Sequence, residues 1–273
     1  MISPSPEACI DIGANLTSER FTADIDIVLE RARTANITHI VVTGTSLSES
    51  EQAILLAKKY SGQLYCTAGV HPHDAKNFTK QSYQQLKSFC QEPCVRAVGE
   101  IGLDFNRNFS SPEQQVLAFE KQIELACETG LPLFLHERDA HDKQWQILQH
   151  YRDDFSAAVI HCFTGSKAQA FRYLDLDLSI GITGWICDER RGLNLQQIVK
   201  DIPLDRLMLE TDAPYLMPRV KPRPALMSKS RNEPCTLPYI LKEIANNRSE
   251  SEQEIAIQTT INAKHFFNIK DSI

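Results

Sequence analysis

Residues 95–100 read VRAVGE, a short apolar run that ends in a carboxylate. Three further segments have the same form, and they are residues 132–136 (PLFLH), 157–161 (AAVIH) and 207–212 (LMLETD). Short apolar runs bounded by turn residues are typical of interior strands. Two imidazoles and two carboxylates at the ends of such strands come together only where the strand ends share one rim. A parallel barrel provides such a rim, so the pattern favours a barrel.

Strand-like and helical segments alternate along the chain. We expect strands at residues 9–12, 38–43, 64–69, 95–99, 133–136, 157–161, 178–183 and 206–210. Apolar residues at the three-and-four spacing of helices occupy residues 25–34, 49–59, 112–129 and 143–151, and a closing helix pair is expected at residues 237–245 and 252–267. Such alternation predicts a parallel sheet. Because no Gly-x-Gly-x-x-Gly turn follows the first strand, we expect a closed α/β barrel, a single (β/α)8 TIM-barrel domain spanning residues 1–273 with an extra C-terminal helix.

Composition limits the class of protein. With 273 residues, 42% hydrophobic residues and a net charge of −6, the sequence is that of a globular chain with a large core. No signal peptide or membrane-length apolar run is present, so we expect a cytoplasmic protein without membrane contact. The absence of heptads favours a monomer.

The eight cysteines show no Cys-x-x-Cys pairing, and Cys90 and Cys94 are expected to be reduced structural thiols.

The mild acidity argues against a protein that coats long duplex DNA, because such binding needs a broad excess of Lys and Arg. It leaves room for a pocket that takes one strand end.

The strand-end residues Glu100, His136, His161 and Asp212 are candidate metal ligands. Each has a plain alternative: a lone strand-end histidine is more often structural, Glu100 can satisfy a neighbouring backbone group, and Asp212 before Ala-Pro can start a turn. Together these alternatives are weak, because two carboxylates and two imidazoles buried on one rim would be costly without a cation. A divalent ion satisfies all four, and the sequence therefore predicts a metal site.

Five motifs together resemble one known family. They are GVHPH (69–73), GEIGLDF (99–105), HERDA (136–140), HCFTG (161–165) and ETDAPY (210–215), followed by RNEP (231–234). In this order they are similar to the TatD family of metal-dependent hydrolases, within the amidohydrolase-like barrels, from about residue 10 to residue 267.

One segment departs from the pattern of many family members. Residues 11–17 read DIGANLT where those members carry Asp-x-His-x-His, so two histidine ligands are absent. Together with DFNRN (104–108) and GITGW (181–185), this variant resembles a bacterial branch of the family. The resemblance implies a magnesium-dependent 3'-to-5' exonuclease acting on the ends of single-stranded DNA and RNA, with a role in DNA repair.

The missing histidines bear on the choice of ion. Zinc favours nitrogen and sulfur donors, whereas magnesium prefers carboxylates and water. We therefore expect Mg²⁺, with Mn²⁺ or Zn²⁺ as alternatives, and leave open whether one or two ions bind. Asp11 or Asn15 can still contact an ion through water.

The resemblance also implies roles in phosphodiester hydrolysis. Glu100 binds the metal and bridges two ions if two are present, while His136 and His161 complete the second site. Asp212 holds the attacking water and accepts its proton. Of the two histidines after the third strand, we favour His71 over His73 to orient the phosphate or to protonate the leaving oxygen.

Cationic residues near the rim are candidate phosphate contacts. Arg219, Lys221, Arg223, Lys229 and Arg231 form a stretch without acids. It is either a merely solvated loop or a clamp on the backbone of a strand end. We take Arg138, Arg219 and Arg231 as the candidates, to which Arg190 and Arg191 can add. Trp185 and Phe105 are candidate stacking platforms for bases, although core packing is an equal alternative.

Two other functions fit the same residues. The first is hydrolysis of an amide or ester by the same barrel, as in a D-aminoacyl-tRNA deacylase. The second is a non-catalytic nucleic-acid-binding barrel, suggested by the lost histidine pair. Against this second alternative, all four remaining ligands and the expected base are present.

Overall fold

The computed structural model describes residues 2–221 and 231–270. Contacts between residues divide the chain into two compact units, each built from several segments. The first unit comprises Met1–Val41, Cys162–Ala170 and Ile180–Ile273, and the second comprises Val42–His161 and Phe171–Ser179.

The chain forms an eight-stranded sheet whose strands follow one another in sequence order. The strands are β1 (Cys9–Ala14), β2 (Ile37–Val42), β3 (Leu64–Ala68), β4 (Val95–Asp104), β5 (Leu133–Arg138), β6 (Ala158–Ile160), β7 (Ser179–Ile182) and β8 (Leu207–Leu209). In the first unit, Ala14 at the end of β1 pairs in parallel with Ala213, just beyond β8. The first and last strands are therefore neighbours, which confirms the predicted (β/α)8 barrel fold.

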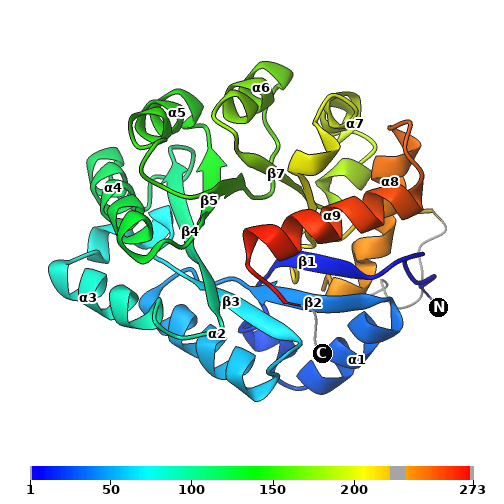
Figure 1. The fold of residues 1–273 in the computed structure, drawn as a ribbon, viewed down its shortest axis with the longest axis horizontal. Helices are drawn as coiled ribbons and strands as arrows, with labels where there is room; N and C mark the ends of the chain where they lie inside the picture. Colours follow the sequence, from blue (N-terminus) through cyan, green and yellow to red (C-terminus); the bar gives the residue numbers. More distant parts are fainter. Residues whose placement is uncertain (1, 222–230, 271–273) are drawn as a thin grey trace. The chain divides into compact units, whose positions relative to one another are not determined.

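Helices occupy the connections between the strands. They are α1 (Ile25–Thr34), α2 (Leu47–Lys59), α3 (Lys80–Phe89), α4 (Pro112–Thr129), α5 (His141–His150), α6 (Lys167–Asp175), α7 (Leu193–Val199), α8 (Leu237–Asn246) and α9 (Glu252–Phe266). In the first unit, α9 runs along β1 (Figure 1). Among the helices within residues 2–221 and 231–270, none combines the length and apolar character needed to cross a membrane.

The ends of α4 show how local sequence sets an element. Ser111 accepts a hydrogen bond from the main-chain NH of Gln114, whose side chain in turn accepts one from the NH of Ser111. Pro112 occupies the first turn, where it loses no helical hydrogen bond. The helix ends at Gly130, whose φ of 71° is a left-handed conformation that glycine adopts without strain. These signals explain why the predicted and observed bounds of α4 agree.

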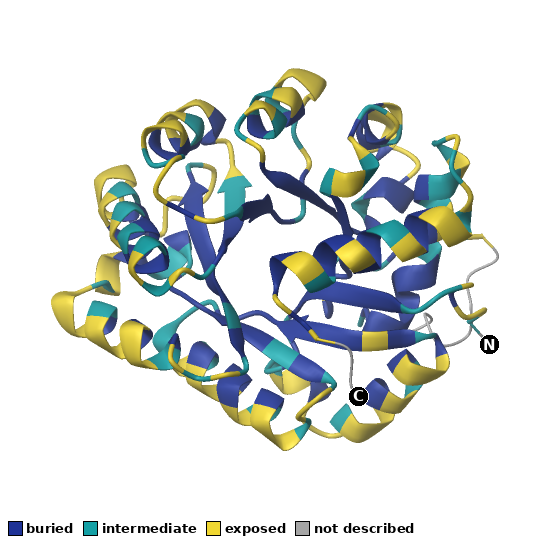
Figure 2. Ribbon diagram, viewed as in Figure 1, coloured by how far each residue is buried: buried dark blue, intermediate teal, exposed yellow. Residues whose placement is uncertain are grey.

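Strands and helices differ in how far their residues are buried. The strands are buried over almost their whole length, and the helices alternate between buried and exposed residues (Figure 2). Parallel strands covered on both faces consist of nearly continuous apolar residues, as the sequence shows.

Strand β4 is longer than predicted, and its pairing with β5 is irregular at Glu100. It extends to Asp104 rather than ending at Gly99. In its parallel pairing with β5, Gly99 lies opposite Phe134 and Ile101 opposite Leu135, so Glu100 is an extra residue in a bulge. Bulges redirect a side chain without ending the strand. The candidate ligand Glu100 occupies this redirected position.

Candidate metal centre

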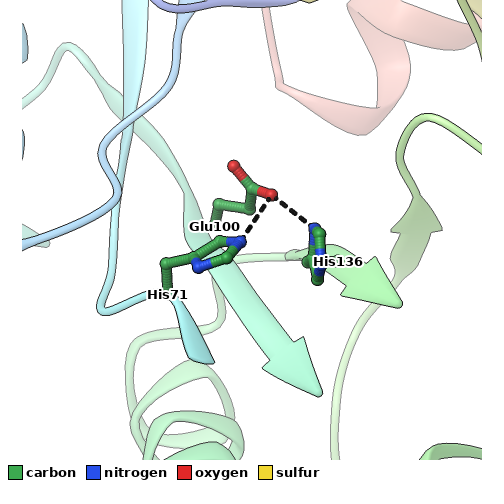
Figure 3. A group of neighbouring side chains, drawn as sticks. All are labelled: His71, Glu100 and His136. Carbon is green, nitrogen blue, oxygen red and sulfur yellow. Dashed lines mark hydrogen bonds and ion pairs between the residues drawn. The ribbon is translucent and has the colours of Figure 1, made fainter. Parts of the chain in front are cut away.

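Glu100 lies among three imidazoles in the second unit. Its Oε1 atom is 2.8 Å from Nε2 of His161 and 2.9 Å from Nδ1 of His136. Nε2 of His71 lies 3.4 Å from the same oxygen. The side chains of His71 and His136 point toward Glu100 from opposite sides (Figure 3). One carboxylate oxygen thus has three nitrogen atoms around it.

The strands of the second unit explain this convergence. His71 follows β3, Glu100 is in the bulge of β4, His136 is in β5 and His161 follows β6. Strands β3 to β6 are successive neighbours in the sheet and are parallel, so residues near their C-terminal ends lie on the same side. The structure therefore brings together three of the four predicted metal ligands, Glu100, His136 and His161, and adds His71.

The charges of Glu100 and His71 are set by their surroundings. Burial alone would raise the pKa of Glu100, but its interactions with His161, His71 and His136 hold it well below its usual range. Burial lowers the pKa of His71 to about 4, against the opposing effect of Glu100. Glu100 is therefore ionised, and His71 is neutral at pH 7. Its Nδ1 accepts a hydrogen bond from the main-chain NH of His73, so its Nε2 carries the proton and faces Glu100.

Asp104, at the end of β4, contacts two of the imidazoles. Its Oδ2 is 2.6 Å from Nε2 of His73 and 3.6 Å from Nε2 of His136. Its Oδ1 accepts hydrogen bonds from the main-chain NH groups of Asn106 and Arg107. Burial would raise the pKa of Asp104, but the nearby His136 ring and the hydrogen bonds with Arg107 and His73 lower it. Asp104 is thus a buried anion next to the His136 ring.

The donor set fits a divalent ion. The candidate ligand atoms of His71, Glu100 and His136 all lie within 4.8 Å of one another. Nε2 of His136 is buried and forms no hydrogen bond within residues 2–221 and 231–270, and Oδ2 of Asp104 approaches it to 3.6 Å. Imidazoles that ligate a metal commonly direct their second nitrogen at such a carboxylate. With Nδ1 of His136 facing Glu100 and Nε2 facing Asp104, the ring has the orientation of a metal ligand.

Asp212 belongs to the first unit, where it follows β8. Its Oδ1 accepts a hydrogen bond of 2.9 Å from Nδ2 of Asn15, and its main-chain NH donates to the carbonyl of Gly13. Asp11 is fully buried in β1 and accepts hydrogen bonds from the main chain and the hydroxyl of Thr211. Residues from β1 thus support the segment after β8. The meeting of Asp212 with Glu100 stays a prediction.

Sequence reasoning missed Glu49, near the start of α2. Burial raises its pKa, and the charges of Glu100 and Asp74 act in the same direction, which places this carboxyl near the cluster. Its side chain also accepts a hydrogen bond from Thr45. The polar residues after the second strand, residues 43–45 (TGT), were the signal that could have extended the rim to this position.

The predicted phosphate contacts differ in how accessible they are. Arg138 is exposed at the end of β5. The Arg219 side chain is half exposed and lies 3.3 Å from Asp188. The Arg231 side chain is only 16% exposed and is paired with Asp24 and Glu233, at 2.7 Å each. The guanidinium of Arg231 is therefore engaged in the fold. Arg223 and Lys229 lie outside the described residues.

Trp185, one of the two candidate base-stacking residues, contacts Arg191. The guanidinium of Arg191 lies 4.3 Å from the ring centre of Trp185, whose indole NH donates to the carbonyl of Arg191. Trp185 and Phe105 are both half-buried.

Comparison with known proteins places the chain in a family. The model of the family described as "TatD related DNase" matches residues 10–268. The 3'-5' ssDNA/RNA exonuclease TatD of Erwinia amylovora is 50% identical over 260 residues, which cover 95% of this chain and 99% of the relative. The protein of the same name from Klebsiella pneumoniae is 50% identical and is covered to 97%.

Solved structures agree with this placement. A TatD homologue from Escherichia coli matches with a TM-score of 0.86 and 30% identity, covering 96% of this chain and 98% of that one. A TatD-family hydrolase from Entamoeba histolytica matches with a TM-score of 0.88 and 26% identity, covering 99% and 100%. The chain belongs to the TatD related DNase family, as its motifs and its fold both indicate.

Proposed function

We propose that this chain is a metal-dependent hydrolase that removes nucleotides from the 3' ends of single-stranded DNA and RNA. The observation that carries the proposal is the arrangement of His71, His136 and His161 around one oxygen of Glu100. Relatives that are 50% identical over 95% of the chain and carry the name 3'-5' ssDNA/RNA exonuclease support the substrate and the polarity. We propose that residues 1–273 act as one catalytic domain.

Glu100, His136 and His161 are the proposed ligands of a divalent ion, and Asp212 is the fourth. When bound, the ion lowers the pKa of a water molecule and polarises a phosphoryl oxygen. We propose Mg²⁺ as the physiological ion, and Glu100 would serve as a ligand to both ions if two bind. The imidazole-rich set makes Mn²⁺ and Zn²⁺ strong competitors, because these ions accept nitrogen donors more readily than Mg²⁺ does.

The chain's own side chains supply the remaining steps. Asp212 orients the attacking water and accepts its proton, while the hydrogen bond from Asn15 fixes the direction of the Asp212 carboxylate. His71 is neutral and buried, so it orients the scissile phosphate more readily than it protonates a leaving oxygen. Glu100 remains ionised throughout, because its pKa lies well below its usual range.

Cationic side chains bind the phosphates of the strand end. We propose exposed Arg138 and half-exposed Arg219 for this role. Arg231 is assigned to the fold instead, since its guanidinium is already paired with two carboxylates. The protein acts as a cytoplasmic monomer in this proposal.

An end-labelled oligonucleotide tests the function directly. Cleavage of a 5'-labelled single strand with Mg²⁺, Mn²⁺ or Zn²⁺ is expected to yield a ladder that shortens from the 3' end and to stop with a chelator. Glu100→Gln and His136→Ala are expected to lower the rate by about 100-fold or more, since each removes a metal ligand. Glu128→Gln and His150→Ala are matched controls at exposed positions and should retain the rate.

Two results would contradict the proposal. One is a ladder that Glu100→Gln and His136→Ala leave unchanged. The other is an inactive protein on oligonucleotides that hydrolyses an aminoacyl ester with the same metal dependence, which would indicate the deacylase instead.

A further inference from the structure

Phe109 is an exposed aromatic residue next to the candidate metal centre, in the β4–α4 loop (residues 105–111). The residue is 54% exposed, and its ring centre lies 4.8 Å from that of His73, with the two ring planes at 87°. Nε2 of His73 lies 2.6 Å from Oδ2 of Asp104, and the ring centre of His73 is 4.3 Å from that of His71. Phe109 therefore adjoins the cluster through His73, and the proposed chemistry gives this ring no role.

Hydrogen bonds fix the loop that carries Phe109. The hydroxyl of buried Ser110 accepts a hydrogen bond from the main-chain NH of Lys76 at 2.9 Å and donates one to the carbonyl of His73 at 3.1 Å. Asn108 has a left-handed φ of 49°, and its side chain donates to a main-chain carbonyl within the loop at 2.7 Å. A ring on a fixed main chain loses little conformational freedom when a ligand covers it, so little of the binding free energy is spent on ordering.

The contact with His73 leaves at least one face of the Phe109 ring uncovered. Perpendicular rings meet edge to face, so His73 cannot cover both faces, and more than half of Phe109 stays accessible. The two aromatic residues expected from the sequence are less available, since Phe105 is half-buried and the Trp185 ring centre already lies 4.3 Å from the guanidinium of Arg191. A flat ligand such as a nucleobase covers an open ring face by stacking on it.

The charges around this loop favour an anionic ligand that carries bases. Arg107 in the loop and Arg138 at the end of β5 are both exposed. The two segments adjoin, because the main-chain NH of Phe105 donates to the carbonyl of Arg138 at 3.0 Å. Asp139, an exposed acid beside them, accepts a hydrogen bond from the side chain of Asn106. Cations next to an open aromatic ring are the combination with which proteins bind single-stranded nucleic acid, the ring holding a base and the cations the phosphates.

We propose that Phe109 stacks on one of the two bases that flank the scissile phosphate and so positions the strand end at the metal centre. This inference rests on the proposed nuclease function, because the ligand is the substrate of that function. Stacking accepts every base, so Phe109 selects for the presence of a base and not for its identity. The contact is the same before and during hydrolysis, so its loss raises KM and leaves kcat nearly unchanged.

The test combines a change in the protein with a change in the substrate. Phe109→Leu keeps an apolar side chain and removes the ring, so KM on an ordinary single strand should rise by about 5-fold or more, and Phe109→Trp should retain the low KM. A strand with abasic sites at its last two positions has no base to stack, so wild type and Phe109→Leu should have the same KM on it. Phe171→Leu is the matched control, because Phe171 is 40% exposed on α6, and it should leave both KM values unchanged.

An unchanged KM in Phe109→Leu would overturn the proposal. An equal rise in KM on the ordinary and the abasic strand would also overturn it, because such a rise indicates a structural role of the ring against His73. In either case wild-type cleavage leaves the nuclease function standing.

Binding tests the stacking even if no strand is cleaved. A strand with a methylphosphonate at its terminal linkage resists hydrolysis, and 2-aminopurine at its last two positions loses fluorescence when a ring stacks on it. We expect wild-type protein at saturation to quench this fluorescence and Phe109→Leu to quench it much less. Equal quenching by the two proteins, or none by the wild type, would contradict the stacking role of Phe109.

Discussion

Asp104 fixes the orientation of the His136 ring. One nitrogen of that ring faces Glu100 at 2.9 Å, and the other faces Asp104 at 3.6 Å. A carboxylate behind a metal-binding imidazole fixes the ring orientation and raises its basicity. Asp104 is only 1% exposed, so its charge acts on His136 with little screening by water.

Replacing Asp104 by Asn is expected to weaken Mn²⁺ binding by about 10-fold to 100-fold without removing a ligand. The amide retains the size of the side chain but loses the charge that orients His136. Isothermal titration calorimetry measures the effect, and Asp139→Asn is the matched control at an exposed position. Unchanged affinity in Asp104→Asn would show that the second nitrogen of His136 needs no carboxylate.

Metal affinity is expected to rise with pH. Burial would lower the pKa of His136, but Asp104 and Glu100 together raise it above 6.5, so the metal-free protein retains a proton there. An ion requires the neutral ring and must displace this proton. The stability that the metal-free protein gains from this pairing is fully present below pH 6.5 and is lost as the pH rises through the raised pKa.

Calorimetry in two buffers of different ionisation enthalpy, on either side of pH 6.5, measures the proton released per ion. Proton release that is larger on the acidic side is expected, and affinity that does not change with pH would contradict the assignment of His136.

Arg231 and Arg219 are expected to separate stability from substrate binding. Arg231→Met leaves Asp24 without its main partner and removes one of the two arginines that bind Glu233, so the free energy of unfolding should fall by about 1–3 kcal/mol with little change in KM. Arg219→Met removes a half-exposed cation and should raise KM while the stability stays within about 0.5 kcal/mol. Urea unfolding and steady-state cleavage distinguish the two variants, and a reversed pattern would return Arg231 to the phosphate contacts.

At the scale of elements, strand β4 carries the main difference between sequence and structure. The apolar run of residues 95–99 predicted the start of the strand, but the strand continues to Asp104. Glycines and the acidic residues at 100 and 104 interrupt the apolar pattern, so local periodicity gave no reason to extend it. The bulge at Glu100 arises from pairing with β5, which is more than thirty residues distant in sequence and lies outside any local pattern.

Gly102 is expected to be required for the close approach of β4 to the main chain of β5. Its φ is 138°, and a methyl group there would overlap the carbonyl oxygen of His136. Because that oxygen is main-chain and belongs to a candidate ligand, Gly102→Ala should destabilise the fold by about 3 kcal/mol or more and weaken metal binding.

Gly130→Ala is the control for backbone strain alone. Its φ of 71° is also positive, but a methyl group would contact nothing within 4 Å. A loss of only about 1–2 kcal/mol with unchanged metal affinity is expected. Thermal unfolding measures the stability of Gly102→Ala and Gly130→Ala, and metal titration measures their affinity for the ion. Equal losses in the two variants would show that the contact with His136 is unimportant.

For the molecule as a whole, charge sets the kind of nucleic acid that binds. A net charge of −6 argues against a broad cationic surface, so we expect few phosphates to be contacted at once. The logarithm of kcat/KM on a single-stranded substrate should fall against the logarithm of salt concentration with a slope of about −1 to −3. Steady-state kinetics between low and physiological salt measures the slope, and a value several times steeper would indicate a long contact with the nucleic-acid backbone.

The sequence predicted the fold and the central ligands because both depend on the ends of apolar strands. Glu100, His136 and His161 are each near such an end, and parallel order alone brings their side chains together. The surroundings of Arg231 depend instead on Asp24, which is distant in the chain, and no local pattern contains that pairing. Glu49 was missed for a different reason, since the polar residues 43–45 after the second strand did carry a signal in the sequence.

Anomalous X-ray diffraction from crystals soaked in Mn²⁺ tests the central claim most directly, because it locates the ion independently of activity. We expect a peak at coordination distance, about 2–2.6 Å, from Glu100, His136 and His161, and its loss in Glu100→Gln. A well-ordered protein with no peak beside these side chains, or with a peak elsewhere that supports cleavage, would contradict the account.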